Sequence, residues 1–437
     1  MARWLRFYQR LSRKLGFRAT LYCVMGVLAA LVAKAIGPYI SEDFSSNIGA
    51  EAVDEILVII ASSMLAVTTF SLSTMVAATS AASNSATPRA SKLLIEDSTA
   101  QRALSTFLGA FLFSLVGLIA LKTNFYGPGG RLVLFLATLV VITIIVVTLL
   151  RWIAHLSRLG RLGETIERVE AAAIESIVAY QQNPAMGGKL FDEPPADAIP
   201  VYVSQIGYIE HLEMSELNSA AEAINSEIYM MMRPGGFCVP GRPVAYIKPT
   251  DPNVKKIDDE FQQTICDALN IADSRTFEDD PRFGLIVLCE ISSRALSPAV
   301  NDPGTAIDVL NKLTRVLSHA VPIEKSQEEE EKAVDYPRVH VRPIRISDLL
   351  EDAFLPLTRD GAGMIEVGIK IQKTCAALGS LHPAFRTPAM EMSRTALERA
   401  MQVLTYEGDK QRLEEEAVAV RETLSRFHDS PCPTMLV

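Results

Sequence analysis

Long apolar runs dominate the first third of the chain. Four of them stand out, at Ala19–Ile36, Ile56–Ala78, Ala103–Leu121 and Leu132–Leu150. Each is close to the about 20 residues that a helix needs to cross about 30 Å of hydrocarbon. A soluble core does not explain four such runs in so short a stretch. The pattern predicts a four-helix transmembrane domain over residues 1–155.

Basic residues alternate between the segments that join these runs. Arg and Lys are frequent before the first run, absent from the loop Ser41–Glu55, and present again between the second and third runs and after the fourth. Cytoplasmic loops carry the excess of Lys and Arg in membrane proteins. We therefore expect a multi-pass protein of the inner (plasma) membrane, with the lipid bilayer as a partner and with both the N- and the C-terminus cytoplasmic.

The second run differs from the others because it is rich in hydroxyl side chains. It reads ASSMLAVTTFSLSTMVAATSAASNSATPRASKLL, and its helical register is expected to continue to Thr87, before Pro88. Small and hydroxyl residues let helices approach closely in lipid, which favours a packing role. Copies from several subunits would instead line a weakly polar pore. The pore-lining candidates are Ser62, Ser63, Thr68, Thr69, Ser73, Thr74 and Ser80.

The remaining two thirds of the chain predict a cytoplasmic α+β domain. A helical extension and a Pro/Gly-rich linker occupy residues 156–195, a small β-rich subdomain follows at 196–250, and residues 251–437 form a largely helical α+β part. In the β-rich block, strands are expected within Ile199–Leu212, in SEIYMMM, and at Phe237–Val239 and Val244–Ile247. The string RPGGFCVPGRPVAYI resembles the turn of barrel-sandwich hybrid domains, so a small β-barrel-like subdomain is expected. An ordinary pair of β-hairpins is the alternative.

The line ISSRALSPAVNDPGTAIDVLNKL is the most patterned in the soluble part. Ser297-Pro298 predicts the end of one helix, and Asp302 with Pro303 predicts the N-cap and first position of the next. Around this line lies a polar constellation of Arg275, Thr276, Asp279, Asp280, Glu290, Arg294, Ser297, Asn301, Asp302 and Thr305. It is interpreted as a buried network of caps and ion pairs, or as a ligand or subunit-contact site with Arg275, Asp279, Glu290, Arg294, Asn301 and Asp302 as its candidates.

Composition and the absence of known motifs limit the kinds of binding and catalysis that the chain is expected to carry out. The net charge of −9 lies mostly after the membrane runs, which argues against a nucleic-acid partner. The six cysteines form no CxxC pair, the six histidines are dispersed, and neither HExxH, GxSxG nor a P-loop occurs. We therefore expect no metal, no cofactor and no catalytic residue, and the chain is not expected to be an enzyme.

Three passages resemble the bacterial predicted membrane proteins grouped as domain of unknown function 2254. They are TPRASKLLIEDSTAQRALSTFLGAF, GYIEHLEMSEL with RPGGFCVPG, and RTFEDDPRFGLIVLCEISSRALSPAVNDPGTA. The resemblance covers nearly the whole chain and implies four membrane helices and a cytoplasmic α+β domain in a bacterial inner membrane. It implies no particular activity.

Two hypotheses for function follow. The first is a homo-oligomeric inner-membrane ion channel or pore-forming protein, in which the second helix lines the conduit and the cytoplasmic domain forms a gate or vestibule. It rests on a hydroxyl-rich run without ionisable groups, joined to a soluble domain without catalytic motifs. The second is a membrane-anchored signalling or scaffold protein, whose cytoplasmic domain binds a ligand or partner.

Overall fold

The chain forms two compact units, Met1–Thr165 and Ile166–Val437. The computed structural model describes residues 52–95, 97–123, 128–251, 253–254, 256–323 and 334–426, and seven helical positions between 20 and 35. The two units are treated separately below.

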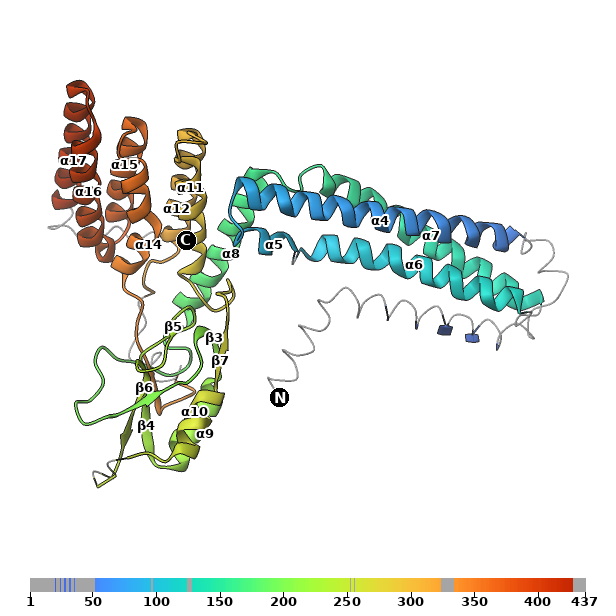
Figure 1. Ribbon diagram of the computed structural model, residues 1–437, viewed down its shortest axis with the longest axis horizontal. Helices are drawn as coiled ribbons and strands as arrows, with labels where there is room; N and C mark the ends of the chain where they lie inside the picture. The colour runs from blue at the N-terminus through green and yellow to red at the C-terminus, as the bar shows by residue number, and fades with distance from the viewer. Residues whose placement is uncertain are drawn as a thin grey trace. The chain divides into compact units, whose positions relative to one another are not determined.

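In the part that the structure describes, unit 1 consists of apolar helices, most of them long (Figure 1). They are α4 (Val53–Ser85), α5 (Ser91–Ile95), α6 (Ser98–Lys122) and α7 (Pro128–Leu156). Among the described residues, three stretches are long and apolar enough to cross a membrane, namely Val53–Ser85, Ser91–Lys122 and Gly130–Leu156. They contain the second, third and fourth predicted runs. The first, Ala19–Ile36, lies almost wholly outside the described residues, so the count of four spans stays a prediction.

Local signals set the helix ends in unit 1. Helix α4 ends at Ser85, two residues short of the predicted end and shortly before Pro88. Asp97 caps α6, because its side chain accepts a hydrogen bond from the Ala100 amide at 2.7 Å.

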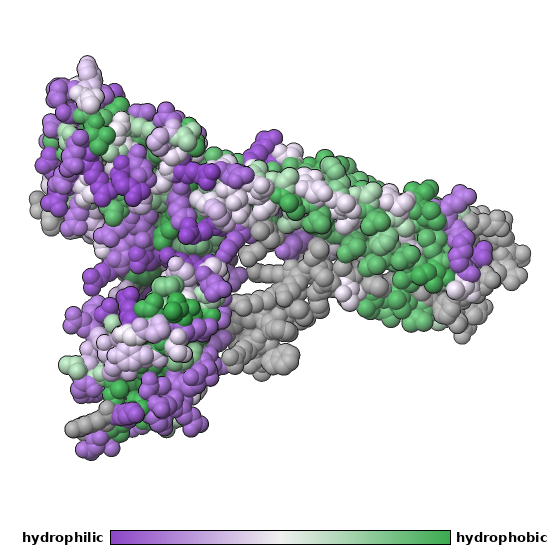
Figure 2. Space-filling model, viewed as in Figure 1, coloured by the Kyte–Doolittle hydropathy of each residue, from purple (hydrophilic) through white to green (hydrophobic). Residues whose placement is uncertain are grey.

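Helix α6 lies against α4 and α7, with Leu57, Phe113 and Leu134 in the buried core between them. Gly117 of α6 makes this approach close, since a Cβ at this position would press on Leu57. The outer surface of these helices is largely apolar (Figure 2), as expected of helices in contact with lipid.

Unit 2 contains two open β-sheets. The strands are β1 (Lys189–Leu190), β2 (Ile199–Tyr202), β3 (Gly207–Leu212), β4 (Ser226–Met230), β5 (Phe237–Cys238), β6 (Pro243–Pro249), β7 (Leu269–Ala272) and β8 (Val339–Val341). One sheet has the order β1-β8-β4-β6-β2 and the other the order β5-β3-β7. Strand β8 lies parallel to both of its neighbours, whereas the other pairs are antiparallel.

The predicted barrel-like subdomain is wrong, because neither sheet closes on itself in the described part of the chain. The Gly-rich turns form as expected, but the strands that they connect separate. Strands β4 and β6 enter the five-stranded sheet, whereas β5 pairs with β3 in the other. Closure is also prevented because β8, which comes from much later in the chain, takes the free edge of β4.

Helices make up the rest of unit 2. They are α8 (Leu162–Gln182), α9 (Met214–Ala223), α10 (Asp259–Asp267), α11 (Phe283–Ala295), α12 (Pro303–Ser318), α14 (Ile346–Asp360), α15 (Ile365–Leu381), α16 (Pro383–Val403) and α17 (Glu407–Arg426). Helices α11, α12 and α14–α17 pack together into one helical layer (Figure 1). Helices α14 and α15 are separated by a break at Gly361, which is the C-cap of α14.

Candidate functional site

Most hydroxyl groups of α4 bond to the backbone of their own helix. Thr69 donates to the Leu65 carbonyl at 3.0 Å, and Ser73 donates to the Thr69 carbonyl at 3.0 Å. Ser62, Ser63, Thr68 and Thr74 bond in the same way, each to a carbonyl one turn earlier. This local bond satisfies the hydroxyl hydrogen, so these side chains need no partner on another helix. The oxygen lone pairs remain available on the surface of α4.

Small and polar side chains form one exposed face of α4, which we call the α4 stripe. All of its members are solvent-exposed in the chain, and their spacing of three or four residues places them on one side of the helix. They are Ser62, Ala66, Thr69, Ser73, Ala77, Ser80 and Asn84. Larger apolar side chains such as Leu65 and Leu72 flank it and are also exposed.

The predicted pore-lining residues divide between this face and others. Ser62, Thr69, Ser73 and Ser80 lie on the α4 stripe, and Ser63 is exposed beside it. Thr68 and Thr74 are only half-exposed and turn toward the sides of the helix. The pattern of hydroxyls alone could not separate these positions, because the buried side of α4 depends on where α6 and α7 lie.

One serine of α4 has a different role. Ser71 is fully buried, and its Oγ accepts a hydrogen bond of 2.9 Å from the indole Nε1 of Trp152 on α7. A buried indole N–H needs an acceptor. Ser71 therefore fixes the contact between α4 and α7, on the side of the helix opposite to the stripe.

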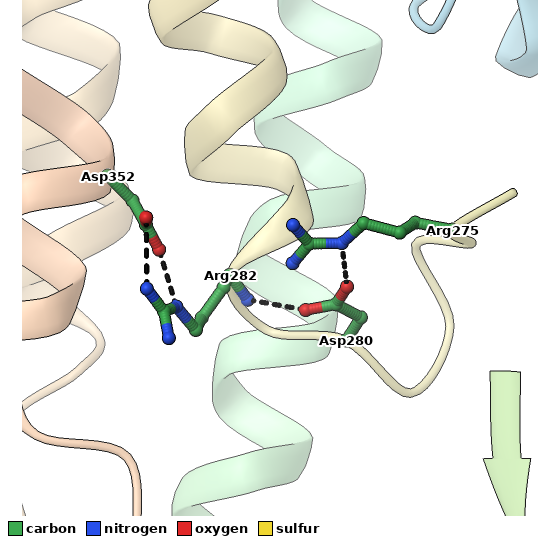
Figure 3. Close-up of polar contacts among 4 residues, drawn as sticks. All are labelled: Arg275, Asp280, Arg282 and Asp352. Carbon is green, nitrogen blue, oxygen red and sulfur yellow. Dashed lines mark hydrogen bonds and ion pairs between the residues drawn. The ribbon is translucent and has the colours of Figure 1, made fainter. Parts of the chain in front are cut away.

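In unit 2, the second candidate region centres on the buried carboxylate of Asp280. This residue belongs to the predicted polar constellation but not to the six residues predicted as a ligand or subunit-contact site. Asp280 is 2% exposed and accepts a hydrogen bond of 2.6 Å from Nε of Arg275. Its other oxygen accepts from the backbone amide of Arg282 at 3.1 Å, at the start of α11 (Figure 3). Burial raises the pKa of the Asp280 carboxyl above its usual range, and the hydrogen bond and charge of Arg275 oppose the shift.

The guanidinium of Arg282 turns away from Asp280, toward α14. Its Nε and Nη2 bond to the two carboxylate oxygens of Asp352 at 2.5 and 3.0 Å (Figure 3). This two-point geometry is the strong form of an ion pair. The four residues Arg275, Asp280, Arg282 and Asp352, here called the Asp280 network, tie a loop, α11 and α14 together.

A glycine of the β-rich part completes the setting of Asp280. Gly235 lies in the RPGG turn with φ of +88°, and a Cβ at this position would overlap the Asp280 carboxylate. Glycine is required there both by the backbone conformation and by the close approach. Two of the passages that carry the family resemblance, RPGGFCVPG and RTFEDDPRFG, therefore meet at one point of unit 2.

The other candidates of this region do not converge on one cavity. Asp279 is exposed and pairs with His211 on β3. Asp302 caps α12 as predicted, accepting from the Thr305 amide at 3.0 Å and from its hydroxyl at 2.6 Å. These donors hold the pKa of Asp302 below its usual range.

The remaining three candidates, Asn301, Glu290 and Arg294, lie on α11 or in the turn between α11 and α12. Asn301, just before the cap, has a positive φ of 51°. Glu290 and Arg294 both lie on α11, the first half-buried and the second exposed.

The described thiols are poor nucleophiles. Burial raises the pKa of both Cys289 and Cys375 to about 12, so both are protonated at neutral pH. Within the described ranges, no group of three or more His, Cys, Asp or Glu side chains is arranged to hold a metal ion.

The family comparison agrees with the resemblance noted from the sequence. The model of the family described as predicted membrane protein, domain of unknown function 2254, matches residues 12–377. This range includes all three candidate spans and most of unit 2.

Similar proteins occur in mycobacteria. Uncharacterized proteins of Mycobacterium bovis and of Mycobacterium tuberculosis strain H37Rv are each 33% identical to the chain over 127 residues. The aligned part is 29% of this chain and only 24% of the length of either relative. No solved structure matches.

Proposed function

The chain belongs to the family of predicted membrane proteins grouped as domain of unknown function 2254, and on this basis we propose that it is a homo-oligomeric channel whose conduit is lined by α4. The observation that carries the proposal is the α4 stripe, whose small and polar side chains are free of charge and exposed from Ser62 to Asn84. Small and hydroxyl side chains of membrane helices gather where helices approach closely or where they line a water-filled conduit. Neighbouring copies of the chain, arranged in a ring, would supply such a cavity.

The hydrogen bonds of the α4 stripe leave acceptor oxygens on its exposed face, which suits a water-filled conduit. Because Thr69 and Ser73 donate to carbonyls of their own helix, they present oxygen lone pairs to the lumen. Such a surface accepts hydrogen bonds from water and suits hydrated cations, whereas it offers few donors to anions. We expect weak cation preference, without a tight binding site in the membrane.

The placement in the cell follows from the distribution of basic residues. We propose a multi-pass protein of the bacterial inner membrane, with four spans and with both termini in the cytoplasm, as the alternation of Lys and Arg favours. Unit 2 is then cytoplasmic and forms the vestibule or gate. We propose no catalytic role and no nucleic-acid partner; the partners are the bilayer, further copies of the chain, and ions.

The test is potassium flux from liposomes that contain the purified full chain. Thr69→Phe and Ser73→Phe should each lower the flux at least fivefold, because a large side chain fills the lumen at every subunit. Leu72→Phe, which enlarges an exposed apolar side chain beside the stripe, should keep most of the flux. Native mass spectrometry should show three or more copies.

Absence of flux from the unmodified protein, or equal flux from all four proteins, would contradict the channel. A stable monomer across mild detergents would remove the shared conduit. Those results would favour the alternative, a membrane-anchored protein whose unit 2 binds a ligand or partner.

A further inference from the structure

A shallow cleft of unit 2 lies between α12 and α15, away from the Asp280 network. Its volume is about 270 Å³, and it is open to solvent on one side. Three cationic side chains line it together with hydroxyl and amide groups. The lining residues are Asn311, Thr314, Arg315, Ser318, Lys370, Lys373, Thr374 and Ala377.

The cations come from both helices and exceed the carboxylates that pair with them. Nη1 of Arg315 lies 2.9 Å from the buried carboxylate of Glu170, and the Arg315 side chain is 59% exposed. Since a guanidinium has five N–H donors in a fixed fork, donors remain for a second anion. Lys373 lies 3.5 Å from Glu416 and is also largely exposed.

Lys370 gives the strongest indication of a ligand. It is half-buried and lines the cleft, yet it has no acidic partner among the residues that the structure describes. Because the cleft is open to solvent, an anion that enters it can reach this ammonium group. Such an anion would supply a counter-ion to Lys370 and to the free side of Arg315 together.

The frame around the cleft is rigid. Glu170 on α8 is 5% exposed and forms ion pairs with Lys312 and Arg315 of α12, each at 2.9 Å, which holds α12 in place. Thr314 and Thr374 meet across the two helices at 3.5 Å between their oxygens. Thr314 also donates to the Leu310 carbonyl at 2.7 Å, and Thr374 is buried, so both hydroxyls belong to the contact between the helices.

We propose that this cleft binds a small phosphate-bearing anion. Arg and Lys together are the usual recognition set for phosphate, with Arg supplying a planar fork and Lys a point charge. With Lys312 included, four cations stand beside the two carboxylates of Glu170 and Glu416, and the remaining positive charge suits a phosphate group. The volume lies just below the range of about 300–1,000 Å³ that holds larger ligands, so the anion is small or only its charged end enters. The site is independent of the pore, because its binding can be measured without transport.

The test is isothermal titration of the full chain in neutral detergent with inorganic pyrophosphate. Saturable binding is expected, and Lys370→Gln/Lys373→Gln should weaken it at least tenfold. The matched control is Arg394→Gln/Arg412→Gln, which removes the same charge from exposed sites on α16 and α17 outside the cleft, and should change the affinity less than twofold. Lys370→Gln alone, which leaves Lys373 and its neighbour Glu416 unchanged, should weaken binding severalfold and serves if the double variant fails to fold.

A second arm identifies the source of the phosphate. Short-chain phosphatidic acid is titrated in the same detergent, and tighter binding than pyrophosphate would assign a lipid headgroup, whereas weaker binding would assign a soluble ligand. No saturable binding of either probe would overturn the proposal. Equal weakening by the cleft variant and the control would also overturn it, because the attraction would then come from net charge alone.

Discussion

The α4 stripe and the Asp280 network are both polar, but their hydrogen bonds are satisfied in opposite ways. On α4 each threonine or serine of the stripe that bonds does so within its own helix, and the face remains exposed. In unit 2, Asp280 and Arg282 bond to groups from other segments, and the carboxylate of Asp280 is buried. Polar groups satisfied locally leave a surface free for a partner. Polar groups whose hydrogen-bond partners lie on other elements stabilise the fold and are not free for a partner.

Breaking the Asp280 network should have the largest effect on stability. Asp280→Asn leaves the guanidinium of Arg275, only 18% exposed, without its negative partner. Loss of one member of a buried ion pair costs about 3–5 kcal/mol. Hydrogen exchange of residues 275–296, followed by mass spectrometry, should accelerate strongly. Asp273→Asn, in an exposed loop position nearby, is the control; equal exchange in both variants would mean that Asp280 does not hold the fold.

Within α4, Ser71 and Ser73 allow a direct test, because the first is bonded to another helix and the second within its own helix. Ser71→Ala removes the acceptor of the Trp152 indole and should lower the stability of unit 1 by about 1–2 kcal/mol. Ser73→Ala removes a bond within the helix and should change it by less than about 0.5 kcal/mol. In a Trp4→Phe background Trp152 is the remaining tryptophan, so its emission reports unfolding directly. Similar losses for both variants would show that the stripe, too, is structural.

The smallest expected effect concerns Asp302, where two substitutions distinguish a helix cap from a ligand-binding residue. Asp302→Ala should destabilise α12 by about 1 kcal/mol, whereas Asp302→Asn, which can also cap, should be nearly neutral. Because the pKa of Asp302 is lowered in the folded state, its contribution is present above the unfolded pKa of about 4 and is lost as the pH falls through the folded pKa. Thermal unfolding between pH 7 and pH 3 measures this. A large loss for Asp302→Asn at pH 7 would contradict a simple cap.

Helices were predictable where the signals are local. Pro88 and the pair Asp302-Pro303 mark a helix end and a helix start, and each lies within three residues of the observed bound. Partners far apart in the sequence were not predictable. Nothing near Arg282 indicates that Asp352 will face it, because no short pattern encodes that meeting.

The candidate site shows the same limit at single residues. Asp279 and Asp280 are adjacent and equally acidic, yet the first is exposed and pairs with His211, whereas the second is buried. The bond from Arg275, the Arg282 amide and the close approach of the RPGG turn distinguish Asp280 from Asp279. The passages RPGGFCVPG and RTFEDDPRFG both carry the family resemblance, but only the tertiary structure shows their contact through Gly235.

Strand β8 has a consequence for how the chain is made. Its residues Val339 and Val341 pair with Ile228 and Met230 of β4, so this edge of the sheet stays open until the ribosome has delivered the intervening segment. At about 5–20 residues per second this wait is on the order of ten seconds. During that interval β4 offers unpaired backbone groups to any neighbouring strand. Synthesis at high density on the membrane should therefore make misassembly, rather than thermodynamic stability, the factor that limits the yield of folded protein.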